Sequence, residues 1–394
     1  MEAVRGFYLR SWRGLVLGLS LALIAYLLYF HRLSSLLPGF SASELTTYTA
    51  VGNWHSIAKN PVNAPYKLLV WLFAIVLRRG ILASRAISAI IGVAIALLFY
   101  VVARAWCHYR VAFISTIMFA TSAGLLRFAR LGTGDVTQMS VLALLVVVLW
   151  YRQQKEWRLL IGYLLVALFV VLCYVPGMFW FEALGFIPLS TTIRGQLRRT
   201  KTIHLAGLLV MFLVLLAPLI IASVGNPRVL LQLSGLPQTV STISHVGHDF
   251  LTLVLGILVH SSGSPALWVG HAPLLDAVEV IIAILGAFYA FREATGRTTF
   301  LFGWLTIGIV LASLGGSVTF ACIVPALYLF IAIGFDHLLG SWLTVFPRNP
   351  IARVTGIGIV CLMAIFSILY QVRTYYVAWP HTPGTREVYS HPAP

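Results

Sequence analysis

The chain has 394 residues, of which 60% are hydrophobic and only 10% are charged, and its mean hydropathy is +0.93. An ordinary soluble domain carries about 25% charged residues. This composition therefore excludes an ordinary soluble domain and indicates a polytopic, all-α membrane protein. In a soluble protein the net charge of +16 would suggest nucleic-acid binding, but here the cations cluster in short loops between apolar segments, where membrane topology and anionic lipid headgroups explain them.

Apolar blocks close to the length needed to cross a bilayer recur along the chain. The first block is too long for a signal peptide, and no small-residue cleavage site follows it, so we expect a retained span. Two shorter apolar stretches, 66–77 and 250–260, predict juxtamembrane or re-entrant helices against the outer leaflet. The pattern predicts about eleven transmembrane helices, at 13–30, 85–104, 111–128, 136–150, 159–176, 179–192, 203–224, 276–291, 299–314, 319–339 and 355–377.

The distribution of positive charge predicts the orientation of these helices. Most of the 27 lysines and arginines fall on the inner side if the N-terminus is cytoplasmic, as the positive-inside rule requires. Both large loops, 31–84 and 225–275, then face outward with the C-terminal tail. We therefore expect a single membrane domain over residues 1–394 in the cytoplasmic membrane, with an extracytoplasmic site and no separate soluble domain.

Glu44, one of only eleven acidic residues, lies in the loop after the first span. Ionisable groups near a bilayer are costly to keep there, so they are functional candidates by default. A partly buried carboxylate could act as a general base for an attacking hydroxyl. Ser41 and Ser43 precede it, however, and an acid after serine is also typical of a helix start. Both interpretations stay open.

Asp135 ends the segment Arg127-Phe-Ala-Arg-Leu-Gly-Thr-Gly-Asp135, on the same predicted side as Glu44. Its predicted roles are to orient an acceptor, to help bind a cation, or to hold Arg130 toward a phosphate. The alternative is a helix-capping aspartate paired with Arg130. If both acids face outward, one chamber collects them from distant parts of the chain.

Lys59, Arg85 and Arg130 are predicted to bind the phosphate of a donor. Arginine contacts phosphate bidentately, and a phosphate leaving group needs its charge stabilised as the bond breaks. Arg127 and Lys67 complete this outer cationic set. Contact with lipid headgroups explains any one of these cations equally well, and it is the favoured interpretation for Lys67.

No metal site or cofactor is predicted, although a divalent cation is compatible with the sequence. His245 and His248 have a metal-like spacing, but no second ligand pair supports it. Glu182 lies in a deeply apolar segment and either forms part of the core or lines a cavity. Trp379 is interpreted as an interfacial anchor.

The order of these features resembles the GT-C class of integral-membrane glycosyltransferases, near the protein O-mannosyltransferases and aminoarabinose transferases. The resemblance covers about residues 13–200, and beyond them it depends on hydropathy and loop placement. The matching features are the acid Glu44 after the first span, Asn60-Pro…Pro65-Tyr66, Ala83-Ser-Arg85, and Ala120-Thr-Ser122…Arg130-Leu-Gly-Thr-Gly-Asp135.

This resemblance implies transfer of a sugar from a polyprenyl-phosphate carrier to a glycan, lipid or protein acceptor, by a single inverting displacement. Glu44 matches the catalytic acid of the first loop and Asp135 the acid of the second outer loop, while Arg85 and Arg130 match basic positions beside the chamber. Many relatives carry Asp-Glu or a lone Asp where this chain has Ser43-Glu44. Whether Glu44 is the base or a displaced substitute therefore stays open.

The competing hypothesis is a secondary transporter or lipid flippase. Such folds usually show paired repeats and helices broken near the bilayer midplane, and the sequence shows neither. Glu182 is the residue that favours transport. A catalytically silent membrane scaffold is the third hypothesis.

Overall fold

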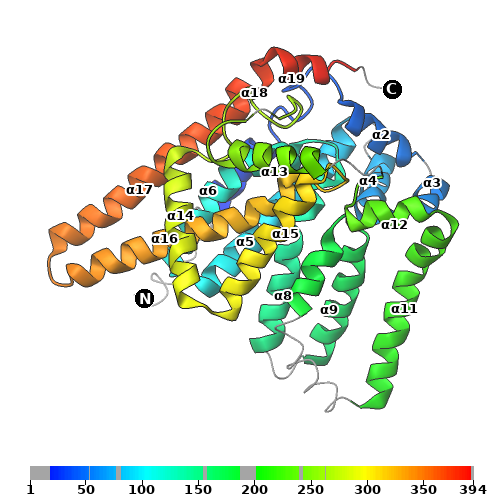
Figure 1. The fold of residues 1–394 in the computed structure, drawn as a ribbon, viewed down its shortest axis with the longest axis horizontal. Coiled ribbons are helices and arrows are strands. Elements are labelled where there is room, and N and C mark those ends of the chain that lie inside the picture. Colours follow the sequence, from blue (N-terminus) through cyan, green and yellow to red (C-terminus); the bar gives the residue numbers. More distant parts are fainter. Residues whose placement is uncertain are drawn as a thin grey trace, which may run out of the picture.

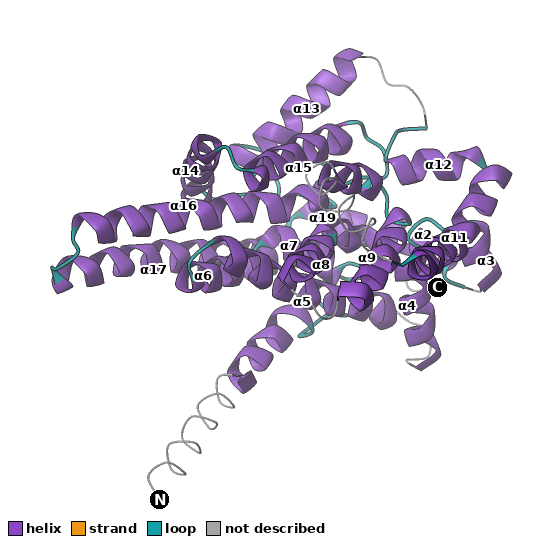
Figure 2. Cartoon of the chain, turned by 90° about the horizontal axis from the view of Figure 1, so that it is seen from below, coloured by secondary structure: helices purple, strands orange, loops and turns teal. Residues whose placement is uncertain are grey.

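A computed structural model describes residues 18–391 except 53, 77–80, 154–157, 187–200, 239–242 and 262. The described chain is helical and contains no strand, apart from one isolated antiparallel bridge between Phe40 and His391 (Figure 2). A first helix runs over Gly18–Tyr29, and residues 178–186 are also helical. The other helices, in chain order, are α2 (Ala42–Ala50), α3 (Trp54–Lys59), α4 (Ala64–Val76), α5 (Ile81–Trp106), α6 (Tyr109–Thr121), α7 (Ala123–Arg130), η1 (Gly134–Met139), α8 (Val141–Gln153), α9 (Arg158–Cys173), α11 (Thr202–Gly225), α12 (Pro227–Ser234), α13 (Ile243–Leu258), α14 (Ala277–Glu293), α15 (Gly296–Ser313), η2 (Phe320–Ile323), α16 (Val324–Val345), α17 (Pro350–Arg373), η3 (Thr374–Ala378), α18 (Trp379–His381) and α19 (Pro383–Val388).

Six helices of the described chain are long and apolar enough to cross a membrane, and the bent pair α6–α7 makes up to seven. The all-α membrane architecture is confirmed, but the count of about eleven spans is not. The difference arises because α9 and α14 have only 16 and 17 residues. In addition, the predicted spans 13–30 and 179–192 lie partly outside the described residues.

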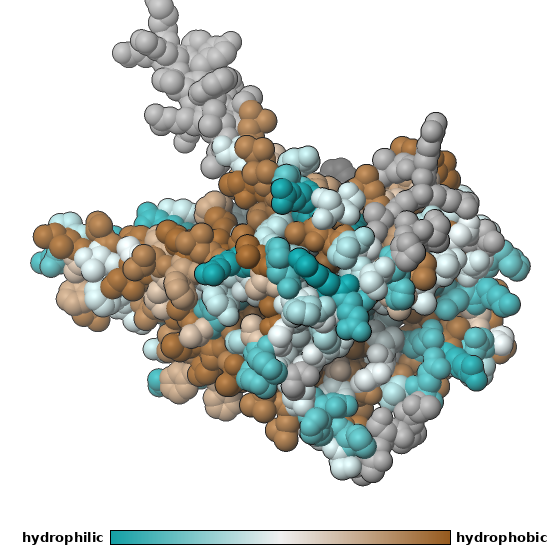
Figure 3. All heavy atoms as spheres, turned by 90° about the horizontal axis from the view of Figure 1, so that it is seen from above, coloured by the Kyte–Doolittle hydropathy of each residue, from teal (hydrophilic) through white to brown (hydrophobic). Residues whose placement is uncertain are grey.

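The two short apolar stretches of the sequence form α4 and α13, which are too short to count as candidate spans. In Figure 1, α2, α3, α18 and α19 lie in the upper part of the molecule, the lower ends of α8 and α11 point toward the bottom, and the turn that joins α16 to α17 lies at the far left. The first large loop and the C-terminal helices therefore share one face, which we call the upper face. Figure 3 views this face from above and shows hydrophilic residues spread across it.

Burial differs sharply between the helices. The span that contains α16 is 78% buried and forms the centre of the core, whereas none of the α11 span is buried. Figure 2 shows α16 and α17 running side by side away from the bundle. A helix that is apolar on every side and packs on few neighbours is suited to face lipid, and α11 has this character.

The predicted span 111–128 is a broken helix. The chain bends by 52° between α6 and α7, at Ser122, whose extended backbone ends one helix while its side chain caps the next (Leu125 N to Ser122 Oγ, 3.1 Å). The amide of Ala123 is satisfied by Gln371 of α17 at 3.1 Å. A long-range side chain therefore completes the hydrogen bonding that the break leaves open.

Candidate active site

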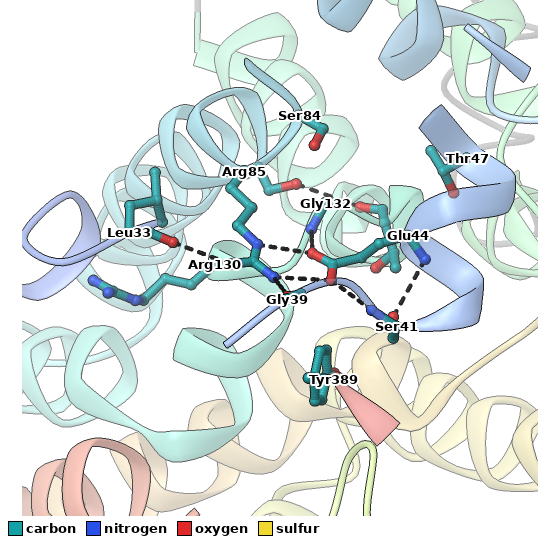
Figure 4. A network of polar contacts seen from close by, with 12 residues as sticks. Leu33, Gly39, Ser41, Glu44, Thr47, Ser84, Arg85, Arg130, Gly132 and Tyr389 are labelled. Atoms are coloured by element: carbon teal, nitrogen blue, oxygen red, sulfur yellow. Dashed lines mark hydrogen bonds and ion pairs between the residues drawn. The ribbon is translucent and has the colours of Figure 1, made fainter. Parts of the chain in front are cut away.

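Glu44 and Arg85 form a buried, bidentate ion pair on the upper face (Figure 4). Arg85 Nε donates to Glu44 Oε1 at 2.9 Å and Nη2 donates to Oε2 at 3.0 Å. Each residue is only 1% exposed. We call this pair the Glu44–Arg85 clamp, because it joins α2 to α5 across 41 positions of sequence.

Glu44 also lies in the first turn of α2 and helps to cap its start, as the helix-start interpretation proposed. Ser41 Oγ accepts from the Glu44 amide at 3.2 Å, and Glu44 Oε2 accepts from the Ser41 amide at 3.1 Å, which forms a capping box. The amide of Gly132 donates to Glu44 Oε1 at 2.7 Å. Each carboxylate oxygen thus accepts two hydrogen bonds, which uses the roughly four lone-pair sites of the group.

The other donors of Arg85 bind carbonyl groups of the first loop. Nη1 donates to Leu33 O at 3.3 Å and Nη2 donates to Gly39 O at 2.8 Å, while the Phe40 ring lies 5.8 Å from the guanidinium. Arg85 therefore holds the loop against α5. The structure does not present it to a ligand, so a contact with a donor phosphate would require the clamp to open.

Two glycines allow the segment after α7 to approach the clamp. A Cβ at Gly92 of α5 would lie 2.3 Å from the Cβ of Ala129, and a Cβ at Gly132 would lie 2.6 Å from Ser84 Oγ. Only glycine permits these approaches, because a side chain at either position would overlap its neighbour. The close packing brings the Gly132 amide to Glu44, and Asp135 follows in the next turn of chain.

Asp135 lies in the first turn of η1 and is half-buried. It forms no ion pair with any residue that the structure describes. Gly132, three residues before Asp135, donates its amide to Glu44 Oε1 at 2.7 Å, so the two predicted acids lie in one region. Asp135 is the acid of this region whose oxygens are not committed to an ion pair among the described residues.

Arg130 is directed away from Glu44 in Figure 4 and is 2% exposed. It donates to Leu28 O at 2.8 Å and His31 O at 2.7 Å, and to the hydroxyls of Tyr375 and Tyr376 at 3.1 and 3.0 Å. These contacts join the end of the first span to η3, which follows α17. The predicted pairing of Arg130 with Asp135 is not formed, and its predicted contact with a phosphate would compete with four existing hydrogen bonds.

A cavity of about 950 Å³ lies between α3, α4, α9 and α11. Its wall is mainly apolar, with Val171, Val214 and Ile221 among its residues, and the exposed Lys59 is its cationic residue. Lys59 is therefore the predicted phosphate-binding cation that the structure places beside an open cavity. Tyr174 also lines the cavity.

Asn63 connects this cavity to the turn that carries Asp135. The backbone amide of Asn63 donates to Tyr174 O at 2.8 Å, and the side-chain oxygen of Asn63 accepts from Thr137 Oγ1 at 3.2 Å. A Cβ at Gly134 would lie 2.6 Å from Asn63 Nδ2. Gly134 thus contacts Asn63, and Asp135 is the next residue. Asn63 lies in the segment that forms one wall of the cavity.

Lys67 is buried, contrary to its expected contact with lipid headgroups. It is 7% exposed, and its Nζ donates to Asn60 O at 2.9 Å. Burial lowers the pKa of the Lys67 ammonium to about 8, because a low-dielectric surrounding disfavours the charged form. This lysine closes the turn between α3 and α4.

The remaining candidate residues lie apart from the clamp. Glu182 is buried and accepts from the Cys173 thiol at 3.3 Å. His245 and His248 are exposed on α13. Within the described ranges, no three His, Cys, Asp or Glu residues lie close enough together to hold a metal ion.

The sequence interpretation missed the C-terminal segment as part of the site. Tyr389 lies beside the clamp (Figure 4), and the bridge between Phe40 and His391 pairs the tail with the first loop. Thr385 Oγ1 donates to Pro265 O at 3.2 Å and Tyr389 Oη donates to Ala266 O at 3.1 Å. The available signal was the aromatic residues Tyr375, Tyr376 and Trp379 around the end of the last predicted span. Trp379 was expected to be an interfacial anchor, but its side chain is fully buried.

No known protein family matches the sequence, and no curated protein matches it either. Among solved structures, ArnT from Cupriavidus metallidurans in the apo state matches with a TM-score of 0.57 and 16% identity, over 96% of this chain and 77% of that chain. The same protein bound to undecaprenyl phosphate matches with a TM-score of 0.55 and 15% identity, over 95% of this chain and 77% of that chain. The chain therefore has the GT-C fold that the resemblance implied.

Proposed function

We propose that this protein is a membrane glycosyltransferase that moves a sugar from a polyprenyl-phosphate carrier to an acceptor by a single inverting displacement. The fold is that of ArnT, one of whose structures holds undecaprenyl phosphate. The observation that carries the proposal is the position of Asp135, which Asn63 links to the wall of an apolar cavity with a lysine beside it.

The cavity suits the donor lipid. Its volume of about 950 Å³ and mainly apolar wall would take an isoprenoid chain, and apolar contact supplies most of the affinity of such a ligand. Lys59 would hold the phosphate at the mouth of the cavity and stabilise its charge as the bond to the sugar breaks. No cofactor is part of the proposal.

The two predicted acids take different roles in this proposal. Asp135 accepts the proton of the acceptor hydroxyl, whose oxygen then attacks the anomeric carbon, and the bond from that carbon to the phosphate oxygen breaks. Polyprenyl phosphate leaves with the electron pair of that bond. Glu44 holds the first loop, α5 and the turn at Gly132 together through four hydrogen bonds. These bonds leave no lone pair of its carboxylate for a substrate.

Replacing Lys59 with glutamine is expected to raise the KM for the polyprenyl-phosphate donor about tenfold, the effect of losing about 1.4 kcal/mol of binding to a charged group. Turnover at saturating donor should fall as well, because Lys59 would stabilise the charge that develops on the leaving phosphate. Initial rates against donor concentration measure both quantities.

Lys201→Gln is the matched control, since Lys201 is exposed just before α11, at the end of that helix far from the cavity residues Val214–Asn226. It should leave KM unchanged. An unchanged KM for Lys59→Gln as well would remove Lys59 from the donor site.

We further propose that the chain lies in the cytoplasmic membrane with the upper face extracytoplasmic. Cysteines placed at the exposed positions Thr46 of α2 and Arg386 of α19 should both react with a membrane-impermeant thiol reagent in intact cells. A cysteine at Arg152, at the far end of α8, should react only after the cells are opened. The reverse pattern would invert the orientation.

A further inference from the structure

Three arginines are buried near the upper face, and their charges are unevenly compensated. Arg85, Arg127 and Arg130 are 1%, 1% and 2% exposed. Glu44 neutralises Arg85, but no carboxylate of the described chain forms an ion pair with Arg127 or Arg130. A buried charge without a partner is costly, so a protein that keeps one needs a compensating interaction.

Hydrogen bonding separates Arg127 from Arg130. Arg130 donates to four oxygen atoms, which compensate its charge in part. Arg127 donates from Nη1 to Leu267 O, and its buried Nε has no hydrogen-bond partner among the described residues. Arg127 is therefore the buried arginine of the site whose charge is least compensated by hydrogen bonds.

A second unsatisfied donor lies in the same cluster. The Trp379 indole N–H is buried without a described partner, and its ring centroid lies 5.4 Å from that of Tyr375 and 5.5 Å from that of Tyr389. Arg127 reaches the same group, because its Nη1 donates to Leu267 O while Tyr389 Oη donates to the neighbouring carbonyl of Ala266. Two unpaired N–H donors, one of them cationic, are thus gathered around one pair of tyrosines.

We propose that Arg127 and Trp379 form a binding site for an anionic group, a phosphate or a carboxylate, carried by the acceptor. A planar guanidinium binds such groups bidentately, and the indole N–H adds a neutral donor. Anion binding stands on this cluster alone, whereas the assignment to the acceptor depends on the proposed function.

The position of the cluster favours the acceptor over the donor. The donor cavity adjoins Asp135 on the side of Asn63. Tyr389, which belongs to the Arg127 cluster, lies beside the Glu44–Arg85 clamp and comes from the C-terminal segment (Figure 4). An anion held by Arg127 would therefore lie on a different wall of the site from a phosphate held by Lys59.

Access to Arg127 requires the C-terminal segment to move. Residues 379–391 and the loop 264–268 enclose the cluster through the hydrogen bonds of Thr385 and Tyr389 to that loop. Opening would break these two bonds and the bridge at Phe40, and it would expose the buried ring of Tyr389. The anion would enter when this cover lifts.

Thermal unfolding of the full-length protein in detergent tests the site without any assay of sugar transfer. Inorganic phosphate, compared with chloride at equal ionic strength, should raise the melting temperature of the wild-type protein with increasing concentration. Arg127→Gln should abolish this rise and should melt at or above the wild type without phosphate, because it removes an unpaired buried charge. Arg152→Gln, at the exposed end of α8, should behave as wild type.

A parallel measurement in nanodiscs with and without phosphatidylglycerol identifies the source of the anion. Stabilisation by phosphate in both kinds of nanodisc supports a soluble or acceptor-borne group. Stabilisation only by phosphatidylglycerol, lost in Arg127→Gln, would show a headgroup site and overturn the acceptor assignment. A phosphate effect that survives Arg127→Gln, or no stabilisation by either anion, would overturn the anion site itself.

A reversible disulfide tests the route of access. A Cβ at Gly384 would lie 3.0 Å from the Cβ of Pro265, close to the ~3.5–4.5 Å of a disulfide. In Gly384→Cys/Pro265→Cys, oxidation should block stabilisation by phosphate, and reduction should restore it. Equal stabilisation in the oxidised and reduced forms would show that the anion enters without movement of the C-terminal segment.

Discussion

Replacing Asp135 with asparagine is expected to lower the turnover of sugar transfer by about 10²–10⁴-fold, the usual effect of losing a general base. The asparagine keeps the size of the side chain but cannot accept the proton of the acceptor. Asp135 forms no ion pair within the described chain, so its loss should leave the protein folded. Initial rates at saturating donor, with a melting curve for each variant, measure both effects.

Asp249→Asn is the matched control, because Asp249 is an exposed aspartate on α13 whose side chain is 56% exposed. It should leave turnover unchanged. Wild-type turnover in Asp135→Asn would remove this residue from the mechanism. In that case Glu44 would have to act as base after the clamp opens.

Breaking the Glu44–Arg85 clamp from either side is expected to destabilise the folded protein by about 3–5 kcal/mol, because the remaining charge stays buried without its partner. Glu44→Gln keeps the shape of the side chain but leaves the Arg85 guanidinium uncompensated. Arg85→Met leaves the carboxylate with the amides of Ser41 and Gly132 as its donors. Denaturant titration in mixed micelles compares the free energies of unfolding.

Combining the two substitutions should recover much of the stability that each one removes, since no buried charge is then left. The partly exposed pair of Glu293 and His337 provides the control, with an expected change of at most about 1 kcal/mol for Glu293→Gln. Additive losses in the double variant would contradict a direct pairing of Glu44 with Arg85.

Local features of the site could be predicted from the sequence because they depend on neighbouring residues. The serine before Glu44 predicted a helix start, and α2 begins there with a capping box. The apolar stretch at 66–77 predicted a short helix, which is α4. Hydropathy likewise identified the long spans, because each one is apolar over its whole length.

Long-range pairings could not be predicted in this way. Arg85 and Glu44 meet across 41 positions, and in the sequence this arginine looks like any cation near lipid headgroups. The break at Ser122 depends on Gln371, which lies 248 positions from Ala123. The contact of the tail with Phe40 depends on the packing of the whole bundle. In each case the partner has no local signature, so only the fold brings the two residues together.

The structure also weakens the transporter hypothesis. Glu182, the residue that favoured transport, accepts a hydrogen bond from Cys173 and is 2% exposed. The acids that converge belong instead to α2 and η1. Their position near a large apolar cavity fits chemistry on a lipid-linked substrate better than passage of a solute.

The fate of the donor distinguishes sugar transfer from transport. Purified protein in liposomes would receive a panel of polyprenyl-phosphate sugars and a cell-envelope fraction as the source of acceptor, and mass spectrometry would follow the carrier. We expect release of free polyprenyl phosphate in step with a new glycosylated product of inverted anomeric configuration, both absent in Asp135→Asn. Intact donor that crosses the bilayer with its sugar still attached, and no product, would contradict the proposed sugar transfer.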